Sequence, residues 1–207
     1  MIKIDAFILI GGRSSRMGTA KATLELSGKT LAARAVDVTV AALSPRRITV
    51  VAGNSSQFAI DAIRVDVPFI FDLHEGRGPL GGLHAALAYA KTPWIFLLAC
   101  DYPRASAELI ELLAGKIDDH SGAVVPEQAD GRIQPLCGFY KVAIAAPVVE
   151  EVLEKPRVPP PMHELVARLD PRIVRFDEYS HLEGAEDFFM NVNNPDDLGR
   201  IRSECKL

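Results

Sequence analysis

Short apolar runs alternate with segments of helical periodicity through the first two-thirds of the chain. The runs are almost continuously hydrophobic, which is typical of strands buried on both faces, and they span residues 4–10, 48–52, 68–71 and 94–100. Helical segments follow three of these runs and begin near Thr30, Pro79 and Ser106. This alternation predicts an α/β fold, a three-layer Rossmann-like sandwich with a mainly parallel sheet and helices on both faces.

The rest of the chain is expected to complete the same domain. Further strands are predicted at 123–126, 136–140 and 173–176, and helices at 143–154 and 163–169. The prolines Pro159, Pro160 and Pro161 favour an extended surface segment, and Pro195 is expected to begin a final helix. Because 207 residues suit one core, we predict a single domain over residues 1–207.

The composition argues against several classes of protein. A formal net charge of −4 disfavours general nucleic-acid binding, and no apolar stretch is long enough to span a bilayer. The N-terminus enters a strand pattern directly and lacks the long apolar region of a signal peptide. Cys100, Cys137 and Cys205 have neither disulfide-framework nor metal-site spacing. We therefore expect a cytoplasmic protein with reduced thiols that uses neither nucleic acid nor a membrane as a partner.

A loop with three glycines, two arginines and a closing lysine follows the first predicted strand. Glycines let the backbone approach a ligand and present N–H groups to it, while the cations offset phosphate charge. The spacing fits neither a P-loop nor the Gly-x-Gly-x-x-Gly pattern of dinucleotide-binding sites. We predict that residues 11–21 form a phosphate-binding loop in which Arg16 and Lys21 bind phosphate. The alternative is a glycine-rich turn with solvated arginines.

Polar residues also follow the other predicted parallel strands, namely Asn54, Asp72 and Asp101. Ligands of parallel α/β sheets bind beyond the carboxyl ends of the strands, so these positions predict one site. Asp101 comes directly after a buried run, and beside a phosphate-binding loop its natural ligand is Mg²⁺. The alternatives are a helix cap for Asp101, a role that Ser106 can fill instead, and a turn aspartate for Asp72.

The segment near residue 192 carries two more candidates. Asn191 and Asn193 are predicted to alternate on one side of a strand end, from which they can reach a metal or a phosphate. Helix capping explains one asparagine of this segment but not both. The five histidines show no ligand-type spacing, and Cys100 is expected to be a small buried residue.

These pieces together resemble a known family. Residues 9–18, Leu-Ile-Gly-Gly-Arg-Ser-Ser-Arg-Met-Gly, with Lys21, are similar to the nucleotide-binding signature of the GT-A-like nucleotidyltransferases, which have the nucleotide-diphospho-sugar transferase fold. Later pieces in the same order and spacing narrow the resemblance to the molybdenum cofactor guanylyltransferases: Gly78-Pro79-Leu80-Gly81-Gly82, Cys100-Asp101-Tyr102-Pro103, Gln134-Pro135-Leu136 and Asn191-Val192-Asn193. The resemblance covers nearly the whole chain.

The resemblance implies an activity and a set of site residues. The activity is Mg²⁺-dependent transfer of GMP from GTP to the phosphate of molybdopterin, with release of pyrophosphate. Other proteins of molybdenum cofactor biosynthesis or delivery are implied as further partners. The implied roles are backbone contacts to the nucleotide from Leu9, Ile10 and Gly11, phosphate binding by Lys21, nucleoside contact by Asp72 and Mg²⁺ binding by Asp101. Other matching positions are Gly12, Arg16, Gly18, Asn191 and Asn193.

Two departures from the family pattern bear on this site. Many relatives have an aspartate directly before the motif lysine, where this chain has Ala20, so support for Lys21 is weaker. The polar residue common near the end of the second strand is replaced by Ala52, and Asn54 is then the nearest polar candidate for nucleoside contact. Two alternatives stay open: a CTP-dependent molybdopterin cytidylyltransferase or other small nucleotidyltransferase, and a non-catalytic nucleotide-binding protein.

Overall fold

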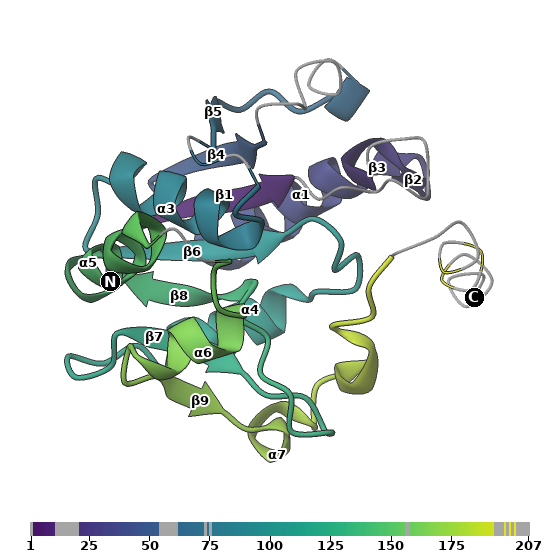
Figure 1. The fold of residues 1–207 in the computed structure, drawn as a ribbon. Coiled ribbons are helices and arrows are strands. Elements are labelled where there is room, and N and C mark those ends of the chain that lie inside the picture. The colour runs from purple at the N-terminus through teal and green to yellow at the C-terminus, as the bar shows by residue number, and fades with distance from the viewer. Residues whose placement is uncertain are drawn as a thin grey trace.

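The computed structural model describes residues 2–10, 21–53, 62–72, 74, 76–155, 158–192, 197, 199 and 201. Its main sheet has seven strands. These are β1 (Ile4–Ile10), β4 (Arg47–Ala52), β5 (Phe69–Phe71), β6 (Trp94–Ala99), β7 (Ala123–Pro126), β8 (Cys137–Lys141) and β9 (Arg172–Val174). Their order across the sheet is β5-β4-β1-β6-β8-β7-β9 (Figure 1). Only β8 runs against its neighbours among these strands, which confirms the predicted α/β fold with a mainly parallel sheet.

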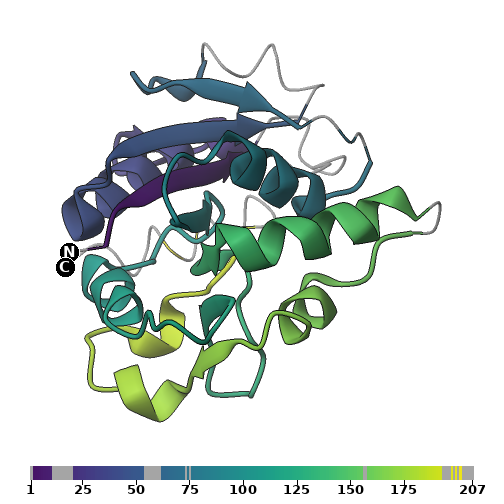
Figure 2. The same ribbon diagram turned by 90° about the vertical axis from the view of Figure 1, so that its left-hand side faces the viewer.

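Helices cover both faces of this sheet (Figure 2). α1 (Leu31–Leu43) and α4 (Ala107–Ala114) pack on one face, and α3 (Pro79–Tyr89), α5 (Val142–Glu154) and α6 (Met162–Ala167) pack on the other. All seven residues of β1 are buried, with Ala6 and Ile8 in the first core layer and Phe7 and Leu9 in the second. No helix within the described ranges has the length and apolar character to cross a membrane.

The helix starts follow the capping residues that the sequence predicts. The Thr30 hydroxyl accepts a hydrogen bond from the Ala33 N–H and donates one to the Ile63 carbonyl, so it caps α1 and also ties it to a distant segment. Thr30 closes a hairpin of two short strands, β2 (Glu25–Leu26) and β3 (Lys29–Thr30). The Ser106 hydroxyl accepts from the Leu109 N–H and caps α4. These contacts confirm the predicted starts of α1 and α4.

The amino edge of the sheet is held by the buried carboxylate of Asp5. One of its oxygens accepts hydrogen bonds at 2.7 Å from the Arg47 guanidinium and at 2.7 Å from the Lys91 N–H, while the Asp5 N–H donates to the Thr92 hydroxyl. Burial alone would raise the pKa of Asp5, but the hydrogen bonds from Arg47 and Lys91 outweigh it and hold the pKa below its usual value. Asp5 therefore links β1 with β4 and with the segment that enters β6.

The chain after β9 differs from the sequence prediction. The strand expected over 173–176 ends at Val174, and Phe176 instead begins α7 (Phe176–Tyr179). Phe176 still packs against the core from its helical position, so the apolar pattern alone did not separate the two structures. α7 begins here because the Glu178 carboxylate accepts a hydrogen bond from the Arg175 N–H. This contact caps the N-terminus of the helix directly after β9.

Glu178 also anchors this corner of the fold to two other elements. Its other carboxylate oxygen contacts Arg172 Nη2 of β9 at 2.5 Å and Lys116 Nζ, just after α4, at 3.0 Å. The pKa of Glu178 is lowered from its usual 4.5 to about 2, mainly by the hydrogen bond from Arg172. Burial alone would raise the pKa, but hydrogen bonds from Lys116 and from the Arg175 N–H also lower it. The carboxylate therefore stabilises the folded state as long as it is charged.

Replacing Glu178 by glutamine is expected to lower stability near pH 7 and to lose that effect in acid. The lowered pKa means that the ionised group stabilises the fold above about pH 4.5, and that this contribution disappears as the pH falls towards about 2. With a discount for partial exposure, we expect a loss on the order of 1–2 kcal/mol in the free energy of unfolding at pH 7. Urea unfolding of both proteins at several pH values measures it.

Glu154→Gln serves as the control, because Glu154 is an exposed glutamate at the end of α5. It is expected to change the free energy of unfolding by less than about 0.5 kcal/mol at every pH. A difference between wild type and Glu178→Gln that stays constant from pH 7 to pH 3 would contradict the ionic role of Glu178.

Candidate active site

The strands β1, β4, β5 and β6 are parallel, so their carboxyl ends lie at the same edge of the sheet (Figure 1). Asp72 follows β5 directly and Asp101 lies two residues beyond the end of β6. Lys21 begins the 3₁₀-helix η1 (Lys21–Thr23). The structure thus brings Lys21 and Asp101 together, with 3.8 Å between Lys21 Nζ and Asp101 Oδ2.

The backbone around Asp101 is fixed from two sides. β6 consists of six buried residues, and beyond its end the Cys100 N–H donates to the Leu9 carbonyl at 3.1 Å. The Asp101 carbonyl accepts a hydrogen bond from the Val192 N–H at 3.2 Å. The backbone at Asp101 is therefore held by the end of β1 and by Val192, which lies 91 residues later in the sequence.

The described residues around Asp101 do not fully compensate its charge. Burial raises the pKa of Asp101, and the Lys21 ammonium offsets this only in part. Its Oδ1 atom is shielded from solvent and has no hydrogen-bond partner among the described residues. A buried carboxylate oxygen without a donor is costly unless a ligand satisfies it. The helix-cap alternative does not apply, because the Ser106 side chain caps α4.

This arrangement suits a magnesium ion that arrives with a nucleotide. Within the described parts of the chain, no group of three His, Cys, Asp or Glu side chains could enclose a metal. Mg²⁺ in nucleotide sites is held by one or two carboxylates together with phosphate oxygens and water, so a protein cage is unnecessary. Asp101 Oδ1 would supply the protein ligand, and Lys21 would pair with phosphate. The residues present therefore fit the predicted ion.

Asp72 is a buried carboxylate set against the first turn of α3. One of its oxygens accepts a hydrogen bond from the His74 N–H at 2.7 Å, a local turn contact of the kind aspartates favour. A Cβ atom on Gly81 would lie 2.2 Å from Asp72 Oδ2 and 2.4 Å from Oδ1. The turn role expected for Asp72 is thus present, and its contact with a nucleoside stays a prediction.

The glycines of the segment 78–82 each have a physical reason. Gly78 has φ +58°, which favours glycine, and it precedes Pro79 at the first position of α3. Gly81 leaves room for the Asp72 carboxylate, and a Cβ on Gly82 would lie 2.9 Å from Leu9 Cδ2. The motif therefore packs the start of α3 closely against the ends of β1 and β5.

The remaining predicted residues divide into three groups. The side chains of Leu9 and Ile10 are buried at the end of β1, so a ligand could meet these residues only through the backbone, and that contact stays a prediction. Asn191 is exposed and, with Val192, lies outside any strand, so the predicted strand end is wrong there; the Val192 N–H bonds to Asp101 instead of continuing a sheet. Other predicted site residues lie outside the described residues, namely Gly11, Gly12, Arg16, Gly18, Asn54 and Asn193.

Sequence reasoning missed a polar chain that supports the segment after Asp101. The buried Tyr102 donates its phenolic hydrogen to Gln134 Oε1 at 2.9 Å, and Gln134 Nε2 donates in turn to Gln128 Oε1. Burial, together with the negative charge of Asp101, raises the pKa of Tyr102, and burial raises that of the Cys100 thiol to about 12. Both groups therefore stay neutral. The only sequence signal was Gln134 in the Gln-Pro-Leu motif.

The fold and this site define an α/β nucleotidyltransferase domain. The family model of the MobA-like NTP transferase domain matches residues 6–170. The chain belongs to this family.

Curated relatives and solved structures agree with this assignment. A probable molybdenum cofactor guanylyltransferase of Carboxydothermus hydrogenoformans is 31% identical over 97% of this chain and 96% of its own length. Molybdopterin-guanine dinucleotide biosynthesis protein A of Archaeoglobus fulgidus superposes with a TM-score of 0.76 at 26% identity, covering 97% of this chain and 98% of its own. The 4-diphosphocytidyl-2C-methyl-D-erythritol synthase of Anaerococcus prevotii shares the fold, with a TM-score of 0.71 at 11% identity over 100% of this chain and 97% of its own.

Replacing Gly81 by alanine is expected to push the Asp72 carboxylate out of place. The helical position itself would favour alanine by about 1 kcal/mol, but the new Cβ would meet both Asp72 oxygens. We expect a net loss of about 1–2 kcal/mol in the free energy of unfolding and a weaker affinity for nucleotide. Chemical unfolding and calorimetric nucleotide titration measure the two effects.

Two further variants isolate the cause. Gly199→Ala also adds a Cβ to a helical glycine, yet no atom of the described residues lies within 4 Å of it, so no loss of stability is expected. In an Asp72→Ala background the additional cost of Gly81→Ala is expected to fall below about 0.5 kcal/mol. An unchanged cost in that background would mean that the clash involves other atoms.

Proposed function

We propose that this chain transfers GMP from GTP to the phosphate of molybdopterin and releases pyrophosphate. The observation that carries the proposal is the Asp101 carboxylate, which faces Lys21 and has a shielded oxygen without a donor among the described residues. The names of full-length relatives, probable molybdenum cofactor guanylyltransferases at about 30% identity, support the choice of substrates.

The chemistry of the described residues suits direct attack by a phosphate on a triphosphate. Both reactants are anionic, so the main requirement is to neutralise and align them. Lys21 would bind phosphate oxygens, and Asp101 would hold Mg²⁺, which when bound stabilises the charge that develops on the phosphates. Cys100 is buried and its thiol has a raised pKa, so it offers no nucleophile.

The identity of the base is the finer part of the proposal. Asp72, at the end of β5, is the described carboxylate best placed to accept hydrogen bonds from a nucleoside. The main rival is a CTP-dependent cytidylyl transfer to the same acceptor. Both reactions use the same metal and phosphate contacts, so only the nucleotide distinguishes them.

Pyrophosphate release from GTP is expected only when Mg²⁺ and molybdopterin are both present. The assay compares GTP with CTP and ATP at equal concentrations and identifies the dinucleotide product by mass. We expect a preference for GTP of at least about tenfold in kcat/KM, which corresponds to one or two differential hydrogen bonds to the base. A CTP preference would assign the chain to the cytidylyl branch, and binding of nucleotide without turnover would indicate a non-catalytic protein.

Replacing Asp101 by asparagine is expected to separate catalysis from stability. Loss of the Mg²⁺ ligand should lower kcat at least about a hundredfold. Because burial disfavours the charge of Asp101, the neutral side chain should leave the unfolding temperature of the ligand-free protein unchanged or raise it by about 2–4 °C.

Activity assays and thermal unfolding of the same preparations test this prediction. Asp118→Asn is the control, since Asp118 accepts hydrogen bonds from the His120 and Ser121 N–H groups in an exposed turn beyond the end of α4. It should retain full activity. If Asp101→Asn is destabilised enough to account for its loss of activity, Asp101 serves the fold and not catalysis.

A further inference from the structure

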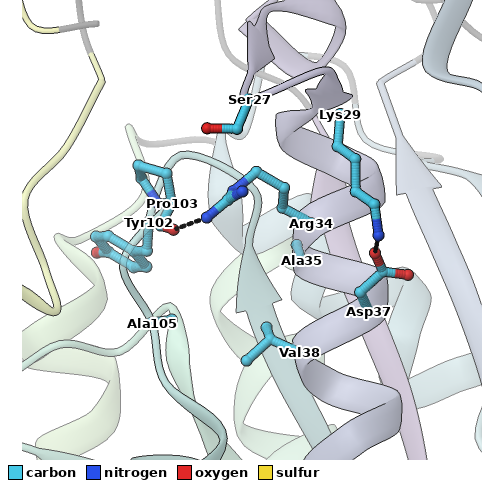
Figure 3. A pocket seen from close by; sticks show the side chains of 9 residues that line it. All are labelled: Ser27, Lys29, Arg34, Ala35, Asp37, Val38, Tyr102, Pro103 and Ala105. Carbon is cyan, nitrogen blue, oxygen red and sulfur yellow. Dashed lines mark hydrogen bonds and ion pairs between the residues drawn. The ribbon is translucent and has the colours of Figure 1, made fainter. Parts of the chain in front are cut away.

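A cavity lies beside α1, between the β2–β3 hairpin and the chain that follows Asp101 (Figure 3). Its volume is about 350 Å³, which is at the lower end of the range for small-molecule sites. Residues of the β2–β3 hairpin, of the first half of α1 and of the segment 102–105 form its walls. The lining residues that bear on the argument are Ser27, Lys29, Arg34, Asp37, Tyr102 and Pro103.

Arg34 is the central group of this cavity, and its hydrogen-bonding capacity is largely unused. It stands in the first turn of α1 and extends towards Pro103 (Figure 3). Its Nη2 donates to the Pro103 carbonyl across 3.4 Å, and its shielded Nε has no partner within the described part of the chain. No carboxylate of the described residues forms an ion pair with it. Of the donors of the guanidinium, the shielded Nε–H is out of reach of a ligand and one Nη2 hydrogen is used, so the other hydrogens of Nη1 and Nη2 are left for a ligand.

The other charges of the cavity do not neutralise Arg34. Lys29 Nζ pairs with the Asp37 carboxylate at 2.5 Å on the far side of the helix surface, so those two charges cancel (Figure 3). The cavity thus has two cations and one anion and keeps one positive charge. Opposite Arg34 stands Ser27, whose φ of +53° in the hairpin turn is uncommon for a residue with a side chain.

We propose that Arg34 binds an anionic, oxygen-bearing group, a phosphate or a carboxylate, at a site separate from the Lys21–Asp101 pair. The planar fork of arginine matches two oxygens of such a group, and the Ser27 hydroxyl can donate to a third. The anion is either part of the acceptor substrate or a free phosphate-type ion. Binding would compete with the Pro103 carbonyl for Arg34, which links the site to the segment that carries Asp101.

Titration with inorganic phosphate tests the proposal without the transfer reaction. The experiment uses the full chain with Lys21→Ala, which weakens phosphate binding at the nucleotide site, and compares it with the same protein carrying Arg34→Gln. Calorimetry is expected to show saturable phosphate binding that Arg34→Gln weakens at least about tenfold in Kd. Absence of saturable binding in the Lys21→Ala protein, or an unchanged Kd in the Arg34→Gln protein, would overturn the proposal.

Two more variants guard the interpretation. Arg64→Gln removes the same charge from the adjacent hollow, where Arg64 is already paired with Glu25 at 3.1 Å, and it should leave the Kd within about twofold. An equal loss in this variant would reduce the effect to general surface charge and so refute a site at Arg34. Arg34→Lys keeps the charge and the buried stem, and it should bind phosphate more weakly than arginine because the fork is lost.

Steady-state kinetics of a protein that carries only Arg34→Gln identify the source of the anion. This experiment rests on the proposed guanylyl transfer. A KM for the acceptor raised about tenfold with kcat unchanged would place an anionic part of the acceptor at Arg34. An unchanged KM together with lost phosphate binding would assign the site to a free anion. The phosphate titration tests the Arg34 site in either case, because it does not depend on the proposed transfer reaction.

Discussion

The parallel pairing of β1 with β6 is the constraint on which the site depends. The register sets Leu9 opposite Ala99, and the Cys100 N–H extends the ladder by one bond to the Leu9 carbonyl. Every residue of both strands is buried, so a shift of one position would exchange the side chains of the two core layers and disturb the packing of both. The register therefore fixes how far Asp101 stands beyond the sheet, and Lys21 returns to within 3.8 Å of it.

The aspartates Asp5 and Asp101 lie at opposite edges of this sheet and differ in how well the protein satisfies their carboxylates. Asp5 receives hydrogen bonds from Arg47 and Lys91, and its pKa is lowered despite burial. Asp101 has one distant ammonium and an oxygen without a donor among the described residues, and its pKa is raised. A carboxylate that serves the fold is satisfied by the fold. Of the two, Asp101 alone has an oxygen that the described residues leave unsatisfied, and this contrast is the reason for proposing a ligand there.

The sequence predicted the parts of the structure that local patterns encode. Buried strands such as β1 and β6 and the caps Thr30 and Ser106 were recognisable because apolar runs and capping side chains act over a few residues. Asp72 and Asp101 were found for the same reason, as polar residues directly after such runs. The strand end predicted at Asn191 was wrong because the N–H of its neighbour Val192 donates a hydrogen bond to the Asp101 carbonyl. Nothing near Asn191 in the sequence indicates that contact.

The fit of Gly81 to Asp72 and the isolation of Arg34 could not be predicted, since each depends on which atoms arrive from another element. A glycine in a helix and an arginine in a first turn are common, and only the tertiary neighbours make them informative. The absent side chain of Gly81 makes room for a carboxylate, whereas the charge of Arg34 has no carboxylate partner among the described residues. Gly81 is therefore explained by the fold itself, because a side chain there would meet the Asp72 carboxylate. The fold does not explain Arg34 in the same way, so of the two residues only Arg34 supports the inference of a binding site.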